Sequence, residues 1–374
     1  YGADTSGQEL ATAAFYKAIR DAAAAGGGTV YVPNGVYLIS NLILQSNVSL
    51  YLEAGAYLMC TEDTSVLSES ERKTTEHGHT VDYPISWMFT TASGSENIRI
   101  YGRGTIDGRG ALMKQQHGWL INLIRTNKTS DFTLEGVTLR DSSHWGCIIY
   151  GSTQVSIRGT KHLNLVKNLN EDDGIDICSS RNVEVLDTLV ISQDDPYSVK
   201  SYAVGETSDV RFEGGLTWTR CAAAKVGYGH VTNVSNIVFR NITAHRCMFG
   251  VNITQYQGQA DTTNVTFENI TVNGFTLLSD HDRASWILID YRDESAGGNV
   301  RGITVSDIRI RSLELLDGYS GRADNNVINS LSESANVDGV ILRNITIDGQ
   351  LCRTLEEMEV TLGGPCGSVV VEAA

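Results

Sequence analysis

The chain has 374 residues, of which 41% are hydrophobic and 20% charged, and its formal net charge is −15. This charge repels a phosphate backbone, so nucleic acid is not expected as a partner. No apolar run approaches the roughly 20 residues that span a bilayer, so no membrane segment is expected. The 37 glycines are spread along the chain, which indicates many tight turns in one folded domain over residues 1–374.

The first predicted element is a short helix over about residues 6–25. Ser6 and Glu9 form a capping box, and Leu10 begins an apolar face at helical spacing. Three glycines, 26–28, end the helix. We expect this helix to cap the open end of a β-sheet, because an uncovered strand edge invites association.

Short strands rich in β-branched residues then recur at a fixed period. Similar segments begin at Asn182, Asp209, Asn236 and Asn264, and their starts differ by 27, 27 and 28 residues. Such a period predicts a solenoid whose repeats bury their apolar faces by stacking. The segments lack a helical pattern, and the period is too short for the roughly 40 residues of a propeller blade. We therefore predict an all-β parallel β-helix, followed by a tail over about residues 350–374.

Two acidic clusters lie about one coil apart, at residues 170–176 and 192–200. Side chains one coil apart stack on the same face, so Asp173, Asp194 and Asp195 are predicted to converge. Close carboxyl groups push their pKa values apart, and glycoside hydrolysis needs one carboxylic acid and one carboxylate. The alternatives are simple turns, which Asp-Asp-Gly favours, and a calcium site.

On these motifs the chain resembles the polygalacturonase and rhamnogalacturonase family, glycoside hydrolase family 28, from Tyr1 to about residue 350. The opening residues 1–4 and the segment 26–35 resemble the entry of pectin-degrading β-helix enzymes. The acidic clusters resemble that family's Asn-Thr-Asp-Gly-Ile-Asp and Gly/Gln-Asp-Asp. The resemblance implies a right-handed β-helix that hydrolyses polysaccharide or oligosaccharide with inversion and without a cofactor. It implies that Asp194 is the acid and that Asp173 and Asp195 activate water.

The departures from that family concern the substrate. Its Gly-His-Gly has its nearest match within residues 225–230, and Pro196 stands where it usually has cysteine. Its Arg-Ile-Lys, which grips a galacturonate carboxylate, falls in register at Asn252, Ile253 and Thr254, where no cation remains. We therefore expect a distant subfamily, or a clan relative such as the dextranase family, acting on a sugar without a carboxylate in the cleaving subsite.

Several other side chains are candidates for the substrate cleft. Each has a structural alternative: a tryptophan in the core, a lysine in an ion pair, a histidine at the surface. The polar stretch 61–82 interrupts the repeats and is a candidate wall of the cleft. His77, His79 and His117 show no repeated metal-ligand spacing, so no metal site is expected. The candidates for substrate binding are His144, Trp145, Lys200, Lys225, Tyr228 and His230.

Eight Asn-x-Ser/Thr sequons indicate a secreted, extracellular glycoprotein, although strand composition explains some of them. Cys352 and Cys366 flank a short segment that a disulfide could close. Tyr1 is interpreted as a processed start, and we expect a monomer. The candidate glycosylation sites are Asn47, Asn127, Asn233, Asn241, Asn252, Asn264, Asn269 and Asn344.

Two other functions stay open at the level of the sequence. A polysaccharide lyase shares the fold class, but it needs a uronate and a cation that neutralises the carboxylate. A non-catalytic β-helix that binds carbohydrate is the second alternative, because a fold alone does not determine chemistry.

Overall fold

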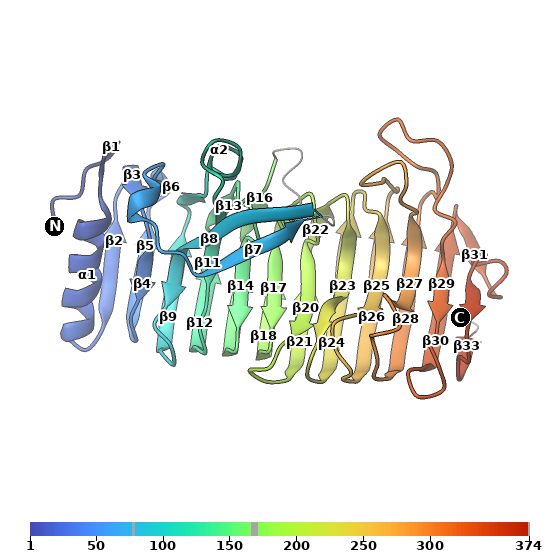
Figure 1. Ribbon diagram of the computed structural model, residues 1–374. Coiled ribbons are helices and arrows are strands. Elements are labelled where there is room, and N and C mark those ends of the chain that lie inside the picture. The colour runs from blue at the N-terminus through green and yellow to red at the C-terminus, as the bar shows by residue number, and fades with distance from the viewer. Residues whose placement is uncertain (77–78, 166–170, 373–374) are drawn as a thin grey trace. The chain divides into compact units, whose positions relative to one another are not determined.

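The computed structural model describes residues 1–76, 79–165 and 171–372, and the chain divides into two compact units, Tyr1–Asp176 (unit 1) and Ile177–Ala374 (unit 2). Each unit is built from coils of short parallel strands (Figure 1). The predicted right-handed parallel β-helix is confirmed. That residues 1–374 form a single domain stays a prediction. No helix in the described ranges is long and apolar enough to cross a membrane.

The N-terminal helix is shorter than expected. Helix α1 covers Thr12–Ala24, because Ser6–Leu10 forms strand β1, which pairs in parallel with β3 (Gly35–Ile39). Ser6 is therefore not the helix cap, and the backbone N–H groups of Ser6, Gln8 and Glu9 donate instead to the carboxylate of Asp4. The buried face of α1 contacts β2 (Gly28–Val32) and β4 (Leu42–Leu44), as Figure 1 shows for β2. Its capping role stays a prediction.

Unit 1 contains strands of two parallel sheets and one antiparallel hairpin. The hairpin joins β7 (Glu71–Glu76) to β8 (His79–Thr91) and corresponds to part of the predicted polar insertion. Short helical turns lie at Thr64–Val66, Gly110–Leu112 (α2) and Met113–His117. The first sheet contains, besides β1–β3, β5 (Val48–Leu52), β6 (Ala56–Cys60), β9 (Glu96–Gly102), β10 (Thr105–Asp107), β12 (Ser130–Glu135), β13 (Thr138–Arg140), β15 (Thr153–Arg158) and β16 (Lys161–Leu163); the second contains β4, β8, β11 (Leu120–Arg125) and β14 (Cys147–Tyr150).

Unit 2 carries the regular repeats that the sequence predicts. Strand β17 (Ile175–Cys178) leads the chain into it. Val210, Ile237, Val265, Ile303 and Val340 follow one another in parallel register, one per coil. Its first sheet contains β18 (Arg181–Leu186), β19 (Leu189–Ile191), β21 (Thr207–Glu213), β22 (Leu216–Trp218), β24 (Val234–Ala244), β26 (Thr262–Val272), β28 (Val300–Ile310), β30 (Val337–Ile347), β31 (Gln350–Cys352) and β33 (Val369–Glu372); the second contains β20 (Tyr197–Ser201), β23 (Ala222–His230), β25 (Phe249–Gln255), β27 (Ser285–Tyr291), β29 (Val327–Asn329) and β32 (Thr361–Gly363).

Asparagines occupy the bends between strand segments in unit 2. Asn236, Asn241, Asn264 and Asn269 all have φ between 51° and 57°, a left-handed conformation that asparagine tolerates better than most residues. The amide of Asn264 donates to Oδ1 of Asn236 at 2.7 Å, and that of Asn269 donates to Oδ1 of Asn241 at 2.6 Å. These stacked bends give a structural reason for the recurrence of Asn-Ile-Thr.

The C-terminal segment differs from the prediction. Residues 350–374 were expected as a tail, yet β32 pairs with β29 and β33 pairs with β30, so this segment extends both sheets. The predicted link between Cys352 and Cys366 is absent. All seven cysteines lie in the described part of the chain, and none of them forms a disulfide there. Cys352 Sγ donates to the carbonyl of Glu357 at 3.3 Å, and Cys366 Sγ donates to that of Gly363 at 3.0 Å.

Candidate active site

The first acidic cluster leads into β17, which includes Asp176, and it lies in unit 1. Asp172, Asp173 and Asp176 are 0%, 3% and 0% exposed. The carbonyl of Asp173 accepts a hydrogen bond from the N–H group of Gly146 at 2.8 Å, and that of Gly174 accepts one from Cys147 at 3.0 Å. The start of β14 therefore fixes the backbone of the cluster. Residue 170, which was included in the predicted cluster, lies outside the described residues.

Two candidate substrate-binding residues lie beside this cluster. The rings of His144 and Trp145 stack with their centroids 5.3 Å apart. Nδ1 of His144 lies 2.9 Å from Oδ1 of Asn122, and its Nε2 lies 3.8 Å from a carboxylate oxygen of Glu171. Trp145 is half-buried, which leaves part of its ring for a sugar.

Lys73 is a residue of this region that sequence reasoning missed. The hairpin β7–β8 brings its ammonium group into an ion pair with Glu171, the acidic residue that His144 also approaches. The polar stretch 61–82 was predicted as a wall of the cleft, but its pattern did not indicate which residue reaches the acidic cluster. Of the histidines considered for a metal, His77 lies outside the described residues.

The second acidic cluster lies just before β20, in unit 2. The carbonyl of Asp194 accepts hydrogen bonds from the hydroxyl groups of Ser192 and Thr219, both at 2.6 Å. The N–H group of Asp195 donates to Oδ1 of Asp194 at 2.9 Å. Asp194 is half-buried and Asp195 is 2% exposed, so a tightly bonded turn presents one partly accessible and one enclosed carboxyl group.

The carboxylate of Asp195 is held on both oxygens. Lys225 Nζ donates to Oδ2 at 2.6 Å, and the N–H group of Ala222 donates to Oδ1 at 3.0 Å. The side chains of Lys225 and Asp195 are 8% and 3% exposed. Burial, the largest single effect, lowers the pKa of Lys225, but Asp195 together with Cys221, Tyr228 and Asp194 raises it by more, so the pKa lies above its usual range. The ammonium and the carboxylate therefore form a charged pair.

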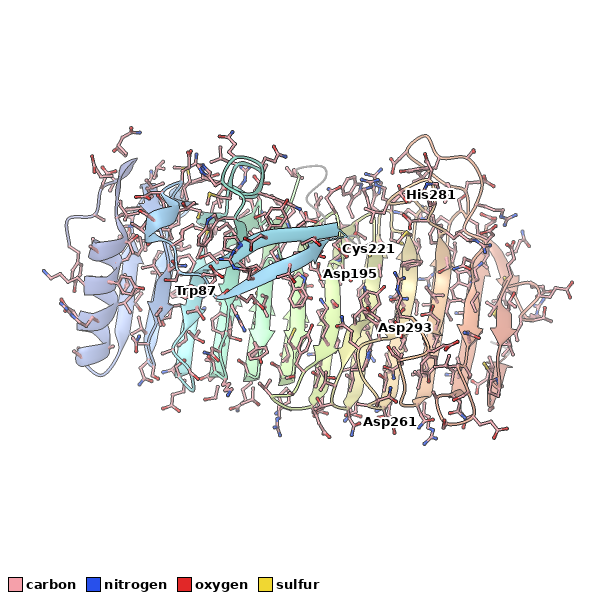
Figure 2. All side chains as sticks on the ribbon, viewed as in Figure 1. Trp87, Asp195, Cys221, Asp261, His281 and Asp293 are labelled. Atoms are coloured by element: carbon pink, nitrogen blue, oxygen red, sulfur yellow. The ribbon has the colours of Figure 1, made fainter. Side chains whose placement is uncertain are left out.

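Cys221 is the second residue that the sequence did not indicate. Its Sγ and carboxylate oxygens of Asp194 and Asp195 lie within 4.8 Å of one another, and Figure 2 shows Cys221 near Asp195. Burial and then the two carboxylates raise the pKa of the thiol well above its usual value. The three groups have the chemistry of a cation site. However, the ammonium of Lys225 already lies in contact with the carboxylate of Asp195 and supplies a positive charge there.

The remaining candidates from the sequence differ in accessibility. Tyr228 is half-buried, and its ring lies 4.2 Å from Lys225 Nζ. Lys200 is 4% exposed in β20. His230 is 0% exposed, and burial lowers its pKa to about 3, so it is a neutral histidine of the interior. Its prediction as a substrate-binding residue is wrong, because no part of its side chain reaches the surface.

The triplet Asn252-Ile253-Thr254, which the sequence aligned with the family's Arg-Ile-Lys, holds neutral side chains and lies beside the carboxyl group of Asp290. Asn252 lies in register between Lys225 and Leu288, and its amide donates to the carbonyl of Leu288 at 3.2 Å. The hydroxyl of Thr254 donates to Oδ1 of Asp290 at 2.9 Å. Burial raises the pKa of Asp290.

The sequons also differ in accessibility. Asn252 is 1% exposed, so its prediction as a glycosylation site is wrong: a glycan does not fit at that position in the folded chain. The asparagines at 47, 233, 241 and 264 are exposed, and those at 127, 269 and 344 are half-buried.

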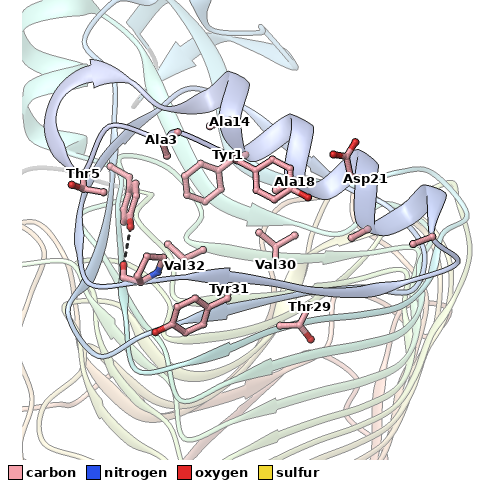
Figure 3. Close-up of a pocket in the computed structure, with 16 residues that line it drawn as sticks. Tyr1, Ala3, Thr5, Ala14, Ala18, Asp21, Thr29, Val30, Tyr31 and Val32 are labelled. Carbon is pink, nitrogen blue, oxygen red and sulfur yellow. Dashed lines mark hydrogen bonds between the residues drawn. The ribbon is translucent and has the colours of Figure 1, made fainter.

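A separate cavity of about 670 Å³ lies between α1 and β2 (Figure 3). Apolar side chains such as Phe15, Ala18 and Val30 dominate its lining, to which Asp21 contributes a carboxylate. Hydrolysis by the two-carboxylate mechanism needs a pair of acidic groups, so this cavity does not match the expected active site.

Three comparisons relate the chain to known proteins. Residues 42–363 match the family described as Glycosyl hydrolases family 28. A protein described as a probable polygalacturonase of Vitis vinifera is 30% identical over 213 residues, which cover 54% of this chain and 43% of that protein. A probable rhamnogalacturonase E of Aspergillus niger is 27% identical over 282 residues, 71% of this chain and 54% of that protein.

The fold also resembles solved structures. A family 28 exopolygalacturonase of Yersinia enterocolitica superposes with a TM-score of 0.70 over 99% of this chain and 76% of that chain, at 17% identity. This likeness concerns the fold alone. The chain spans about half the length of the curated relatives that it matches.

Proposed function

The chain belongs to glycosyl hydrolases family 28, and from that premise we propose that it hydrolyses glycosidic bonds of a polysaccharide or oligosaccharide with inversion. Asp194 is the general acid, and Asp173 and Asp195 activate the water. In such a reaction the acid protonates the leaving oxygen, while a carboxylate removes a proton from water on the opposite face of the sugar.

The observation that carries this proposal is the contrast between the two adjacent aspartates. Asp195 accepts a hydrogen bond from the Lys225 ammonium at 2.6 Å and a backbone hydrogen bond at 3.0 Å. Asp194 is the more accessible of the two, and its Oδ1 accepts a hydrogen bond from the N–H group of Asp195. A carboxyl group held by an ammonium beside a more accessible one supports a base at Asp195 and an acid at Asp194.

We propose further that the sugar in the cleaving subsite carries no carboxylate. Asn252 and Thr254 offer no positive charge, and the partner of Thr254 is the carboxyl group of Asp290. Ionised Asp290 would repel a uronate, whereas hydroxyl groups of a neutral sugar can donate to it. We also propose that the protein is secreted, as the sequons and the family suggest, and that it acts as a monomer.

A panel of neutral and acidic polysaccharides, assayed for new reducing ends, tests the proposal. We expect hydrolysis of a neutral or mixed polymer and little or no activity on polygalacturonate. Ready hydrolysis of polygalacturonate would refute the neutral-sugar assignment. Products with an unsaturated sugar would indicate a lyase, and binding without turnover across the panel would indicate a carbohydrate-binding β-helix.

A further inference from the structure

Lys225 lies between a carboxylate and an aromatic ring inside unit 2. Its Nζ atom is 2.6 Å from Oδ2 of Asp195 and 4.2 Å from the centre of the Tyr228 ring, whose electron-rich face attracts a cation. The guanidinium of Arg292 lies 5.9 Å from the same ring. The Lys225 ammonium is therefore held on two sides by groups of this unit.

This enclosure makes Lys225 a poor ligand for substrate. Its side chain is 8% exposed and that of Asp195 is 3% exposed. If the ammonium moved away to bind a sugar, it would leave a buried carboxylate uncompensated, which is strongly unfavourable. Its stable location is the contact with Asp195.

We propose that Lys225 is a positioning residue, which keeps Asp195 ionised and fixes the orientation of its carboxylate, instead of binding substrate. This role rests on the proposed function of Asp195. The N–H group of Ala222 completes the arrangement, because with Lys225 on Oδ2 and Ala222 on Oδ1 the carboxylate cannot rotate without losing a hydrogen bond.

The charges around this contact make the ammonium necessary. Asp194 lies next to Asp195 in the chain, and a second carboxylate at close range opposes ionisation of the first. Lys225 supplies the positive charge in contact with Asp195, while the guanidinium of Arg292 lies 5.9 Å from the centre of the Tyr228 ring. The titratable and charged groups of unit 2 that surround the Lys225–Asp195 contact include Asp194, Cys221, Tyr228, Asp290 and Arg292.

The pH dependence of the reaction separates a positioning role from a binding role. The catalytic base must be ionised, so kcat/KM falls on the acid side as the base gains a proton. Without the ammonium, Asp195 takes up its proton at a higher pH. In Lys225→Met we expect the acid limb of the kcat/KM profile to move up by about 1–3 pH units, which corresponds to a roughly 10- to 1000-fold loss on that limb.

Two further variants isolate the effect of the charge. Lys225→Arg keeps a cation, so its acid limb should stay within about 0.5 pH unit of the wild-type position, even if kcat falls because the larger group shifts the carboxylate. Arg246→Met is the matched control, because Arg246 is likewise paired with a carboxylate (Asp317) and lies 3.8 Å from an aromatic ring (Trp218). We expect it to leave the acid limb unchanged.

The measurements distinguish failure of this inference from failure of the proposed function. A raised KM with unchanged kcat and an unmoved acid limb in Lys225→Met would overturn the positioning role. If the wild-type protein hydrolyses nothing, the proposed function fails, and the carboxyl titration of Asp195 followed by ¹³C NMR still tests the contact. The titration midpoint should rise in Lys225→Met, or in Lys225→Gln if the methionine variant does not fold. An unchanged midpoint would refute the inference.

Discussion

At the scale of single residues, two neighbouring aspartates differ in their contacts: Asp195 accepts hydrogen bonds from Lys225 and from a backbone N–H group, and we propose that Asp194 is the acid. The amide in Asp194→Asn cannot protonate a leaving oxygen, yet it nearly preserves the size of the side chain. We expect turnover of the natural polymer to fall by roughly 10²–10⁴-fold, the usual contribution of general acid catalysis. An activated aryl glycoside, if accepted, should lose less, because its leaving group needs little protonation.

The matched variant Asp195→Asn should slow both kinds of substrate, because the base acts on the water and not on the leaving group. Circular dichroism of each variant checks that it is folded. Near-normal turnover of the polymer by folded Asp194→Asn would show that Asp194 is not the acid.

A second prediction at this scale concerns buried His230, whose pKa is lowered by burial from its usual 6.5 to about 3. Between these two pH values the unfolded chain binds a proton at this residue and the folded chain does not. The free energy of unfolding should therefore fall as the pH drops through this window, by up to about 1.4 kcal/mol per pH unit for one group.

Denaturant unfolding at several pH values between 7 and 4 measures this slope. In His230→Asn the slope should be smaller than in the wild type, whatever the loss of stability at neutral pH. His281→Asn, at an exposed position that Figure 2 labels, is the control for loss of any histidine. An identical slope in His230→Asn and the wild type would contradict the buried, neutral state of His230.

The sequence predicted the acidic residues of the two clusters because their coil-length spacing is visible in one dimension. It could not predict the charged partners that these acidic residues contact. Lys225 is 30 residues from Asp195 in the chain, and Lys73 is 98 residues from Glu171. The burial of His230 could not be predicted either, because it depends on how β23 packs against parts of the chain that are distant in the sequence.

At the scale of elements, a stack of aromatic rings connects neighbouring coils of unit 2. Phe212, Phe239 and Phe267 lie one coil apart with ring centroids 4.9 and 5.1 Å apart and nearly parallel planes. Each such pair contributes about 0.5–1.5 kcal/mol beyond the area that it buries. The free energy of unfolding should therefore fall more in Phe239→Leu than in Phe275→Leu, by about 1–3 kcal/mol.

Phe275 is a suitable comparison because it is also fully buried in unit 2, where its backbone bridges Cys247 and Leu315. Denaturant unfolding of the two variants measures the difference. Equal losses would show that burial alone explains the contribution of the stack.

The repeating strands were predictable because their period recurs in the sequence, whereas the ends of the chain were not. Ser6 and Glu9 match a capping box, but parallel pairing with Gly35–Ile39 places residues 6–10 in a strand. Similarly, β33 was expected in a tail, because only its pairing with β30 makes it part of a sheet. In both cases long-range pairing outweighs the local pattern.

At the scale of the whole chain, the net charge of −15 agrees with a substrate that is not strongly acidic. The family match over residues 42–363 covers both acidic clusters and the position of the missing cations. We therefore propose that the chemistry of the family is combined in this chain with a substituted substrate subsite.

The stereochemistry of the product tests the account most directly. A substrate from the polysaccharide panel is hydrolysed by the wild-type protein in the NMR tube, and the anomeric protons are followed before mutarotation. An acid and a base on opposite faces of the sugar displace the leaving group by water in one step, so the first product should have the inverted configuration. A first product with the retained configuration would require a covalent intermediate and would contradict the assignment of Asp173 and Asp195 as residues that activate water.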